Sequence, residues 1–449
     1  MSAPMDASLV YDGGRLLIRG VEFSPPYAKW DGVLGAYTCE AIHYSEAKRH
    51  LLSLGVRLSE RVFEPLEFRP FTSKYALRDY QLRAYDAWLA AERRGIIVLP
   101  TGAGKTAVAI HAISETSVPA LVVVPTIDLL KQWGGQLEAQ GAEVGYLGGG
   151  MNSVKGVTVS TYDSAAIRAG ELGNRFRLLV FDEVHHLPAQ VYAKIARLSA
   201  AEYRLGLTAT YEREDGLHTL LPYLVGRVVY SSTHSELSGR YLSEYSTEVV
   251  RVSLGGEEKA KYDELMDKYR GILRKHNFRI RSQRDFQRLI FLSGSNRELR
   301  EALLSRNEAQ KIAFNSSGKI RVLRGLLERF RGERIIVFTQ HNELVERISR
   351  EFLIPSITHE TPKDEREEVL GRFREGVYTC VVTSKVLDEG VDVPDASVGI
   401  ILSGTGSRRE YVQRLGRILR KRDGKVAQLV EVVSGGTMEV NTSYRRRRV

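Results

Sequence analysis

Short runs of apolar residues alternate with longer amphipathic stretches in two separate parts of the chain. In the first part the apolar runs are GIIVLP, ALVVVPT, VTVSTYD, LLVFDEV and YRLGLTAT, and in the second they are RIIVFTQ, TCVVTSK, VGIILSG and AQLVEVV. Near-continuous valine, isoleucine and leucine strands between helices are typical of parallel sheets covered on both faces. The pattern therefore predicts two α/β units, over residues 76–230 and 316–449.

The remaining segments follow other patterns. Residues 231–315 have no strand rhythm beyond STEVVRVSL, which predicts a helical insertion. Its apolar side chains recur at helical spacing: Leu265, Met266, Tyr269, Ile272, Leu273, Leu289, Ile290 and Leu292. Residues 1–75 are mixed in character and predict a small α/β domain, with a helix over EAKRHLLSL that is capped by Ser45 and ends at Gly55.

The composition restricts the class of protein. Hydrophobic residues make up 43% and charged residues 27%, as in ordinary globular proteins. No apolar run approaches the roughly 20 residues that cross a bilayer, and the N-terminus lacks the features of a secretion signal. Cys39 and Cys380 are too few for a disulfide framework, a four-cysteine zinc site or an iron–sulfur cluster. We expect a monomer without membrane contact that is intracellular, cytoplasmic or nucleoid-associated, or nuclear if its source is eukaryotic.

The net charge of +10 suggests a polyanionic partner, and one segment concentrates it. Residues 268–288 hold eight basic residues against one acid, Asp285, and the aromatic residues Tyr269, Phe278 and Phe286 lie among them. Two interpretations stay open: a solvated helical face whose aromatic rings are core, or a surface that tracks phosphates with rings available for stacking. The run Arg445–Arg448 is interpreted as a basic tail that adds non-specific affinity.

The loop PTGAGKT, at residues 100–106, follows an apolar strand and precedes a helix. Gly102 and Gly104 permit backbone angles that let N–H groups point at phosphate oxygens, and the helix N-terminus adds partial positive charge. Lys105 would reach the β- and γ-phosphates, and the Thr106 hydroxyl would hold Mg²⁺. Leu99 replaces a usual glycine only at the strand exit, where the backbone need not contact phosphate. The predicted ATP-binding residues are Thr101, Gly102, Ala103, Gly104, Lys105 and Thr106.

A second chemical motif, DEVHH, ends another apolar strand, where α/β sheets gather their ligands. Asp182 suits the second coordination shell of Mg²⁺, and Glu183 can polarise the attacking water as the catalytic base. Acids at a strand-to-helix turn are also common helix starts. For His185 we favour a role in coupling the nucleotide to the next sheet over metal binding with His186, because no further His or Cys stands at zinc spacing.

These motifs resemble those of superfamily 2 helicases. LRDYQ at 77–81, PTGAGKT, DEVHH and TAT at 208–210 come in that family's order, and TSKVLDEGVDVP at 383–394 and QRLGRILR at 413–420 follow in the second unit. More narrowly, YRLGLTATYERED resembles the XPB family, the helicases of the transcription factor TFIIH and of nucleotide excision repair. That family carries an Arg-Glu-Asp element directly after Thr-Ala-Thr. The chain resembles the compact archaeal or bacterial form.

The resemblance implies an architecture and further site residues. It implies two RecA-like parallel-sheet domains, 76–230 and 316–449, an N-terminal damage-recognition-like domain, 1–75, and a linker with a helical thumb-like insertion, 231–315. Arg417 and Arg420 would act as arginine fingers, with Gln413 near the γ-phosphate, and Gly390 and Asp392 would line the same cleft. The residues that would contact adenine are Arg78 and Gln81. Thr208 and Thr210 would join His185 in coupling.

Expected DNA contacts fall into three groups. Strand ends and loop starts provide Thr126, Thr161, Thr339 and Thr383, whose hydroxyls and N–H groups can bind phosphates. By resemblance, Arg213, Glu214 and Asp215 form a wedge that splits the duplex, although a plain solvated loop is the alternative. The thumb would contribute Arg274, Lys275, Arg281 and Arg284.

The sequence thus predicts an ATP- and Mg²⁺-dependent DNA helicase or translocase that acts on duplexes, forks or damaged sites. The resemblance alone implies 3′–5′ polarity and nucleotide excision repair, and a structure-specific repair nuclease is a candidate partner. One alternative is an ATP-gated translocase or remodeller without processive unwinding, and another is an RNA helicase. A third is the motor of a restriction-type nuclease, because Asp31, Glu46 and Lys48 superficially form a D…E-x-K pattern.

Overall fold

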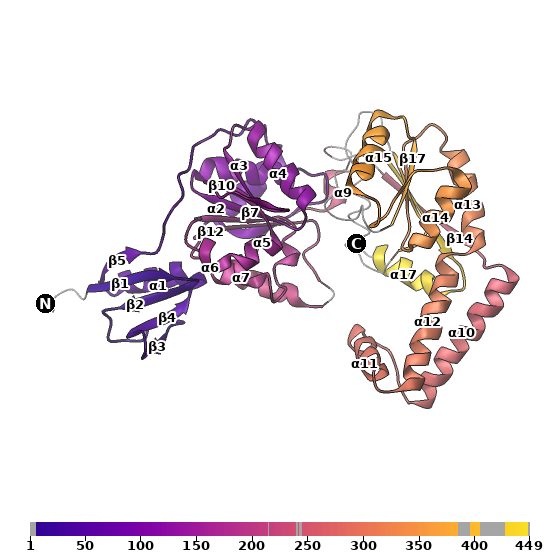
Figure 1. Cartoon of the computed structure of the whole chain (residues 1–449), viewed down its shortest axis with the longest axis horizontal. Coiled ribbons are helices and arrows are strands. Elements are labelled where there is room, and N and C mark those ends of the chain that lie inside the picture. The colour runs from indigo at the N-terminus through magenta and orange to yellow at the C-terminus, as the bar shows by residue number, and fades with distance from the viewer. Residues whose placement is uncertain are drawn as a thin grey trace. The chain divides into compact units, whose positions relative to one another are not determined.

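The computed structural model describes residues 6–213, 215–238, 241, 245–384, 396–404 and 427–447. These residues belong to two compact units, one that ends at Leu237 and one that begins at Ser238. Figure 1 colours the first unit from indigo to magenta and the second from pink to yellow. No described helix combines the length and the apolar character that a membrane span requires.

The first unit begins with a small mixed sheet in the strand order β3-β4-β2-β1-β5. Its strands are β1 (Asp6–Asp12), β2 (Arg15–Arg19), β3 (Lys29–Asp31), β4 (Ala36–Glu40) and β5 (Arg57–Arg61). β5 runs parallel to β1, because η1 (Ala41–His43) and α1 (Tyr44–Ser53) form the crossover before it. The helix begins at Tyr44 without a side-chain cap, so the predicted Ser45 cap is wrong.

The first parallel sheet has eight strands in the order β13-β6-β12-β11-β7-β10-β8-β9. They are β6 (Arg94–Val98), β7 (Ala120–Val124), β8 (Val144–Gly148), β9 (Met151–Asn152), β10 (Val157–Thr161), β11 (Leu178–Phe181), β12 (Tyr203–Thr208) and β13 (Val228–Ser231). Every pair is parallel except β8–β9. β7, β10 and β11 bury every residue, which explains the continuous apolar sequences of β7 and β11 and confirms the predicted parallel α/β fold.

Helices connect these strands. They are α2 (Asp79–Ala90), α3 (Lys105–Thr116), α4 (Ile127–Ala139), α5 (Tyr162–Ile167), α6 (Ala169–Leu172), α7 (Ala193–Arg197), α8 (Leu221–Leu224) and α9 (His234–Leu237). The short turns η2 (Val184–His186) and η3 (Leu217–Leu220) follow β11 and β12. The carboxyl ends of the parallel strands, where α3, α4 and α5 begin, therefore share one edge of the sheet.

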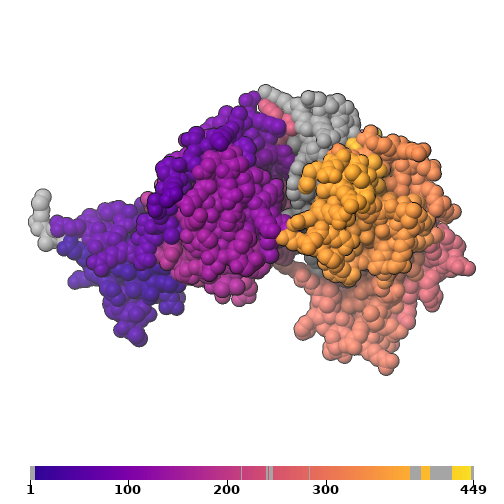
Figure 2. Space-filling model, turned by 45° about the horizontal axis from the view of Figure 1, so that its top comes forward, coloured from indigo at the N-terminus to yellow at the C-terminus, as the bar shows by residue number. Residues whose placement is uncertain are grey.

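The N-terminal sheet contacts this parallel sheet within the first unit. The Tyr11 hydroxyl lies 2.7 Å from Gly170 O and 2.9 Å from Leu198 O. Arg197 pairs with Glu40, and Ala200 belongs to the apolar core of the N-terminal sheet. Figure 2 shows the two parts as adjoining indigo and purple surfaces.

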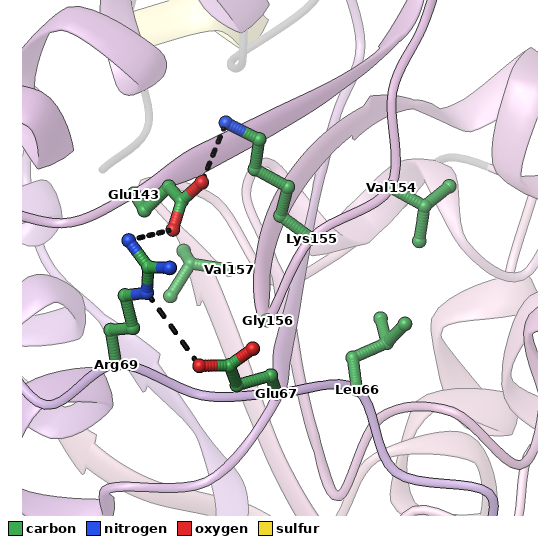
Figure 3. Close-up of a pocket in the computed structure, with 8 residues that line it drawn as sticks. All are labelled: Leu66, Glu67, Arg69, Glu143, Val154, Lys155, Gly156 and Val157. Atoms are coloured by element: carbon green, nitrogen blue, oxygen red, sulfur yellow. Dashed lines mark ion pairs between the residues drawn. The ribbon is translucent and has the colours of Figure 1, made fainter.

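An extended segment, residues 62–78, joins the two sheets of the first unit and lines a pocket of about 260 Å³ (Figure 3). Glu143 accepts ion pairs from Arg69, at 3.2 Å, and from Lys155, at 3.0 Å. A Cβ added to Gly156 would lie 2.2 Å from Glu67 O, so only glycine lets the segment pass this closely. None of the predicted site residues lines the pocket, and we interpret its contacts as anchoring the segment.

The second unit contains a six-stranded parallel sheet in the order β14-β19-β18-β15-β17-β16. Its strands are β14 (Tyr245–Val252), β15 (Ile335–Phe338), β16 (Ser356–Ile357), β17 (Cys380–Thr383), β18 (Val398–Ile401) and β19 (Ala427–Ser434). Described helices of this sheet are α13 (Ser317–Arg329), α14 (Asn342–Phe352), α15 (Lys363–Glu375) and α17 (Met438–Arg447). β14, the STEVVRVSL sequence, pairs with β19 along eight residues, so it belongs to this sheet rather than to the helical insertion.

A buried ion pair ties α17 to α13. Lys319 and Glu439 are both 0% exposed, and Lys319 Nζ lies 2.6 Å from one oxygen of Glu439 and 2.7 Å from the other. Lys319 also donates to Leu402 O, directly after β18. The pair therefore links three parts of the second sheet.

The helical insertion consists of α10 (Gly256–Lys275), α11 (Gln283–Ser293) and α12 (Arg297–Phe314), with α10 and α12 side by side (Figure 1). Its core contains Tyr262, Met266, Tyr269, Leu273 and Leu289, with Phe278 and Phe286 packed against it. Tyr269 is therefore core, as the first interpretation expected, and the rings of Phe278 and Phe286 are partly buried against that core.

Candidate functional site

The loop that connects β6 to α3 has the geometry of a phosphate cradle. Gly102 and Gly104 have φ of 82° and 75°, values that favour glycine, and Gly104 caps α3. Leu99 is fully buried, and its N–H donates to Thr208 O at 3.0 Å, so this position packs into the core. Lys105 Nζ lies 3.3 Å from Leu99 O, and the Thr101 hydroxyl is buried without a hydrogen-bond partner in the described part of the chain.

Two residues of α2 hold this loop in place by hydrogen bonds to its backbone. The Tyr80 hydroxyl and Gln81 Nε2 donate to Ala103 O at 2.7 and 2.9 Å. Gln81 Oε1 accepts from Arg78 N at 2.8 Å. A Cβ on residue 104 would lie 2.4 Å from Gln81 Nε2, so the side-chain amide of Gln81 packs directly against Gly104 and leaves no room for a larger residue there. The adenine contacts of Arg78 and Gln81 remain a prediction, and Tyr80, within the LRDYQ motif, supports the loop in a role that the sequence did not assign to it.

Asp182 and Glu183 follow β11 at the same edge of the sheet. Asp182 is buried, and its Oδ2 accepts the indole N–H of Trp133 at 2.8 Å, while its Oδ1 accepts Glu183 N–H at 3.0 Å. Glu183 has φ of 47° in the left-handed region, a strained conformation of the kind that clusters at functional sites. Trp133 lies on α4, 49 residues before Asp182 in the chain. The one signal for this contact in the sequence is that a buried indole N–H usually needs a hydrogen-bond partner.

Hydrogen bonds connect the DEVHH segment to the Thr-Ala-Thr segment. His185 is buried, and its Nδ1 lies 3.1 Å from Thr208 Oγ1 and 3.4 Å from a carboxylate oxygen of Glu183. The Thr208 hydroxyl donates to Thr210 O at 2.8 Å, so it accepts from the imidazole N–H. Because Thr208 O also accepts the N–H of Leu99, the chain of contacts runs from Glu183 to the phosphate loop.

The Arg-Glu-Asp element connects to the same segment. The Arg213 guanidinium donates to His185 O and forms a bidentate pair with Asp215, at 3.0 and 2.6 Å. The bond from Arg213 lowers the pKa of Asp215 to about 2. Glu214 lies outside the described residues. Two members of the predicted wedge are therefore bound to each other and to the DEVHH segment.

The predicted threonine contacts fall into two kinds. Thr126 and Thr161 cap α4 and α5, and their hydroxyls accept from Leu129 N and Ser164 N. Thr339 and Thr383 are fully buried, and each hydroxyl donates to a neighbouring backbone carbonyl, so both position loops instead of presenting a hydroxyl to solvent.

A glycine turn that the motif search missed lies beside Thr126 and Thr161. Gly148, Gly149 and Gly150 all have positive φ, and added Cβ atoms would lie 2.8 Å from Thr161 Cγ2 and 3.2 Å from Ile127 Cδ1. Successive N–H groups in such turns form anion-binding concavities. The signal was the run of three glycines after an apolar strand.

The predicted thumb cations differ in their surroundings. Lys275 pairs with Glu298 at 2.6 Å. Arg274, Arg281 and Arg284 are exposed and, within the residues that the structure describes, have no carboxylate at ion-pair distance. Gly390, Asp392, Gln413, Arg417 and Arg420 lie outside the described residues, so the structure does not place the predicted arginine fingers.

The residues of the nuclease alternative lie on two elements: Asp31 ends β3, whereas Glu46 and Lys48 lie on α1. Asp31 Oδ1 accepts the N–H groups of Val33 and Leu34 in a turn. Lys48 lies on α1 and pairs with Glu60 at 2.9 Å. Across the described ranges, no group of three or more His, Cys, Asp or Glu side chains has the arrangement of a metal site.

Two RecA-like sheets, the first with a phosphate loop and an acidic pair at the carboxyl ends of its strands, define an ATPase of the helicase class. Family models match at residues 74–213, described as the res subunit of type III restriction enzymes, and at 318–422, described as the helicase conserved C-terminal domain. The helicase domain of Hef from Pyrococcus furiosus shares the fold, with a TM-score of 0.56, 20% identity, and coverage of 83% of this chain and 98% of that one.

Curated relatives show to which family of helicases the chain belongs. The DNA 3′-5′ translocase XPB2 of Sulfurisphaera tokodaii is 48% identical over 433 residues, which cover 96% of this chain and 98% of that protein. The DNA 3′-5′ helicase XPB of Mycobacterium tuberculosis is 30% identical over 83% of this chain and 63% of its own length. The chain belongs to the XPB family of superfamily 2 DNA helicases and translocases, and it is an ATPase. It spans nearly all of the first relative but less than two thirds of the second.

Proposed function

We propose that this protein is an ATP-dependent DNA translocase that moves 3′ to 5′ and opens duplex DNA in nucleotide excision repair. The observation that carries the proposal is the chain of contacts from the phosphate loop through Thr208 and His185 to Glu183 and Arg213. A change at the nucleotide therefore has a direct route to the loop after Thr210. The names and the identity of the Sulfurisphaera and Mycobacterium relatives support DNA as the track and 3′–5′ as the direction.

The residues of the phosphate loop, 100–106, suit a nucleoside triphosphate. Lys105 is close enough to exchange Leu99 O for phosphate oxygens, and the buried Thr101 hydroxyl can donate to a ligand. Thr106 and Asp182 offer the oxygen donors that Mg²⁺ prefers, and the ion would neutralise phosphate charge during hydrolysis. Trp133 holds the Asp182 carboxylate in place, and Glu183 receives the proton of the attacking water.

The second RecA-like domain completes the ATP site in this proposal. Gln413, Arg417 and Arg420 would stabilise charge on the transferred phosphoryl group, and Gly390 and Asp392 would line the cleft. An arginine finger contributes roughly 10³–10⁵ in rate in related phosphoryl-transfer enzymes. These assignments rest on the match of the sequence to the helicase C-terminal family model.

DNA would lie along the edge of the first sheet formed by the N-termini of α4 and α5 and the glycine turn 148–150. Helix N-termini and glycine-turn N–H groups bind phosphates without regard to sequence. The thumb cations Arg274, Arg281 and Arg284 would add contacts, with Lys275 partly neutralised by Glu298. We assign Arg213 and Asp215 to coupling as well as to strand separation. We assign the N-terminal domain to damage recognition, with a structure-specific repair nuclease as a partner of the protein.

A translocase that remodels duplexes without unwinding them is the second candidate, favoured by the name of the Sulfurisphaera relative. Two ATP-dependent assays separate the candidates: displacement of a third strand from a triplex, and unwinding of a fork with a 3′ single-stranded tail. We expect both activities. Triplex displacement without fork unwinding would select the remodeller, and failure of both would overturn the motor function.

A further inference from the structure

Helix α11 presents a solvent face that combines arginines with an aromatic ring. Phe291 is 81% exposed, whereas Leu289, two residues earlier, is fully buried. Arg284, Gln287 and Arg288 are exposed as well. Because residues three, four and seven positions apart share a helix face, Arg284, Gln287, Arg288 and Phe291 form one surface, here called the α11 face.

The opposite side of α11 fixes the direction of this face. The ring of Phe286 lies 4.7 Å from the guanidinium carbon of Arg306 on α12. Arg300, also on α12, donates to Ser293 O at 3.2 Å and Gly294 O at 2.8 Å. Together with buried Leu289 these contacts attach α11 along its length. The α11 face is therefore held toward solvent by packing, and Phe291 cannot turn into the core.

The charge of the α11 face is positive. Among the described residues, neither Arg284 nor Arg288 has a carboxylate at ion-pair distance. The one acid of α11, Asp285, caps the N-terminus of the helix. Its Oδ2 accepts hydrogen bonds from Arg281 N at 2.9 Å and from Ser282 N at 2.8 Å. These bonds, chiefly the one from Arg281 N, lower the pKa of Asp285.

We propose that the α11 face binds single-stranded DNA, with Arg284 and Arg288 on phosphates and Phe291 stacked on a base. A single exposed apolar residue is ordinary on a protein surface, but Phe291 shares its helix face with Arg284 and Arg288, which have no carboxylate partner among the described residues. Aromatic rings in a cationic groove are the common means of holding single strands without sequence preference. An apolar protein partner would instead cover the guanidinium groups of Arg284 and Arg288 without supplying negative charge to balance them.

The dimensions agree with a short stretch of one strand. Arg284 and Phe291 are separated by about 10 Å along the helix axis, from a rise of about 1.5 Å per residue. A stacked strand advances about 3.4 Å per nucleotide, so the α11 face corresponds to about three nucleotides. The inference rests on the proposed function, because it requires that the protein bind DNA. It adds that the ring of Phe291 contacts the bases.

A double cycle with protein and DNA variants tests the stacking contact. The full chain and Phe291→Ala are titrated with a fluorescent oligothymidylate and with an abasic oligonucleotide of the same length. The abasic strand has the phosphates and sugars but no bases on which a ring could stack. Phe291→Ala is expected to weaken binding of oligothymidylate about 5- to 150-fold and to leave binding of the abasic strand within twofold. Equal effects on both strands would overturn the proposal.

Two further variants separate the ring from apolar area and from helix stability. Phe291→Leu keeps apolar area without a π face and is expected to retain most of the defect. Ile290→Ala removes apolar area from the same helix at a side chain that is 50% exposed, and it is expected to bind both strands as the wild type does. A defect in Ile290→Ala equal to that of Phe291→Ala would contradict stacking.

The failure of the inference differs from the failure of the proposed function. If the wild type binds both strands and Phe291→Ala matches it on each, the stacking role is refuted while DNA binding stands; a face for a protein partner would then explain the ring. If the wild type binds neither strand and its ATP hydrolysis does not respond to DNA, the proposed function fails, and the inference fails with it.

Discussion

Replacing Trp133 by phenylalanine is the most direct test of how the acidic pair is positioned. The substitution keeps an aromatic ring in a site that is 1% exposed but removes the N–H that lies 2.8 Å from Asp182 Oδ2. A hydrogen bond to a charged group contributes about 1.5–3 kcal/mol. If the carboxylate must hold its orientation in the transition state, the loss corresponds to about a 10- to 150-fold decrease in kcat.

The assay is steady-state ATP hydrolysis at saturating DNA over a range of Mg²⁺ concentrations. We expect Trp133→Phe to lower kcat and to raise the Mg²⁺ concentration required for half-maximal rate by about 10- to 100-fold, as is typical when a residue that orients a metal ligand is lost. Binding of a fluorescent ATP analogue should weaken less than kcat falls, because Lys105 and the loop N–H groups are unchanged.

Trp88→Phe is the matched control. Trp88 is fully buried in the same unit, and its indole N–H donates to Arg204 O at 2.9 Å, far along the chain from the acidic pair. Both variants lose an indole hydrogen bond and leave a small cavity, so both are expected to lose stability. A Trp133→Phe enzyme whose kcat stays within twofold of that of Trp88→Phe would refute the positioning role.

Three other predictions follow from the described contacts. Glu183→Gln should bind ATP with near wild-type affinity and lose DNA-stimulated hydrolysis, measured by nucleotide binding and phosphate release; normal turnover would refute the assigned base. Neutralising the thumb residues Arg274, Lys275, Arg281 and Arg284 should make the log–log salt dependence of single-strand binding shallower by about 2, since Lys275 is already paired; an unchanged slope would exclude phosphate contacts. Lys319→Met should destabilise the second sheet by about 3–5 kcal/mol in denaturant unfolding, and adding Glu439→Gln should recover part of that loss; strictly additive effects would contradict a coupled buried pair.

Much of the fold could be predicted because its strands are buried on both faces. β7 and β11 are continuous apolar runs, and the phosphate loop and DEVHH stand at their expected strand ends. β14 was harder to place because its partner β19 lies far along the chain and β14 stands at the sheet edge. In α11 the apolar pattern included both Leu289 and Ile290, but Leu289 is fully buried whereas Ile290 is 50% exposed.

The contacts that tune the site could not be predicted, because they join residues that no motif relates. Trp133 and Asp182 meet only when α4 packs against β7, β8 and β10, near the carboxyl end of β11. Arg213 reaches His185 O because the loop after β12 folds back over η2. Exposure of Phe291 also depends on tertiary packing, since the sequence around it contains equally apolar residues that are buried. Motifs identify the reacting groups, whereas packing determines how they are held.

The central claim is that ATP hydrolysis at Glu183 is coupled to DNA. Its most direct test is the ATPase rate of the full chain measured in parallel without nucleic acid, with single-stranded DNA, with duplex DNA and with RNA. We predict that DNA raises kcat well above the basal rate and that RNA does so far less. A rate that is the same in all four conditions, or that RNA stimulates as strongly as DNA, would contradict the account.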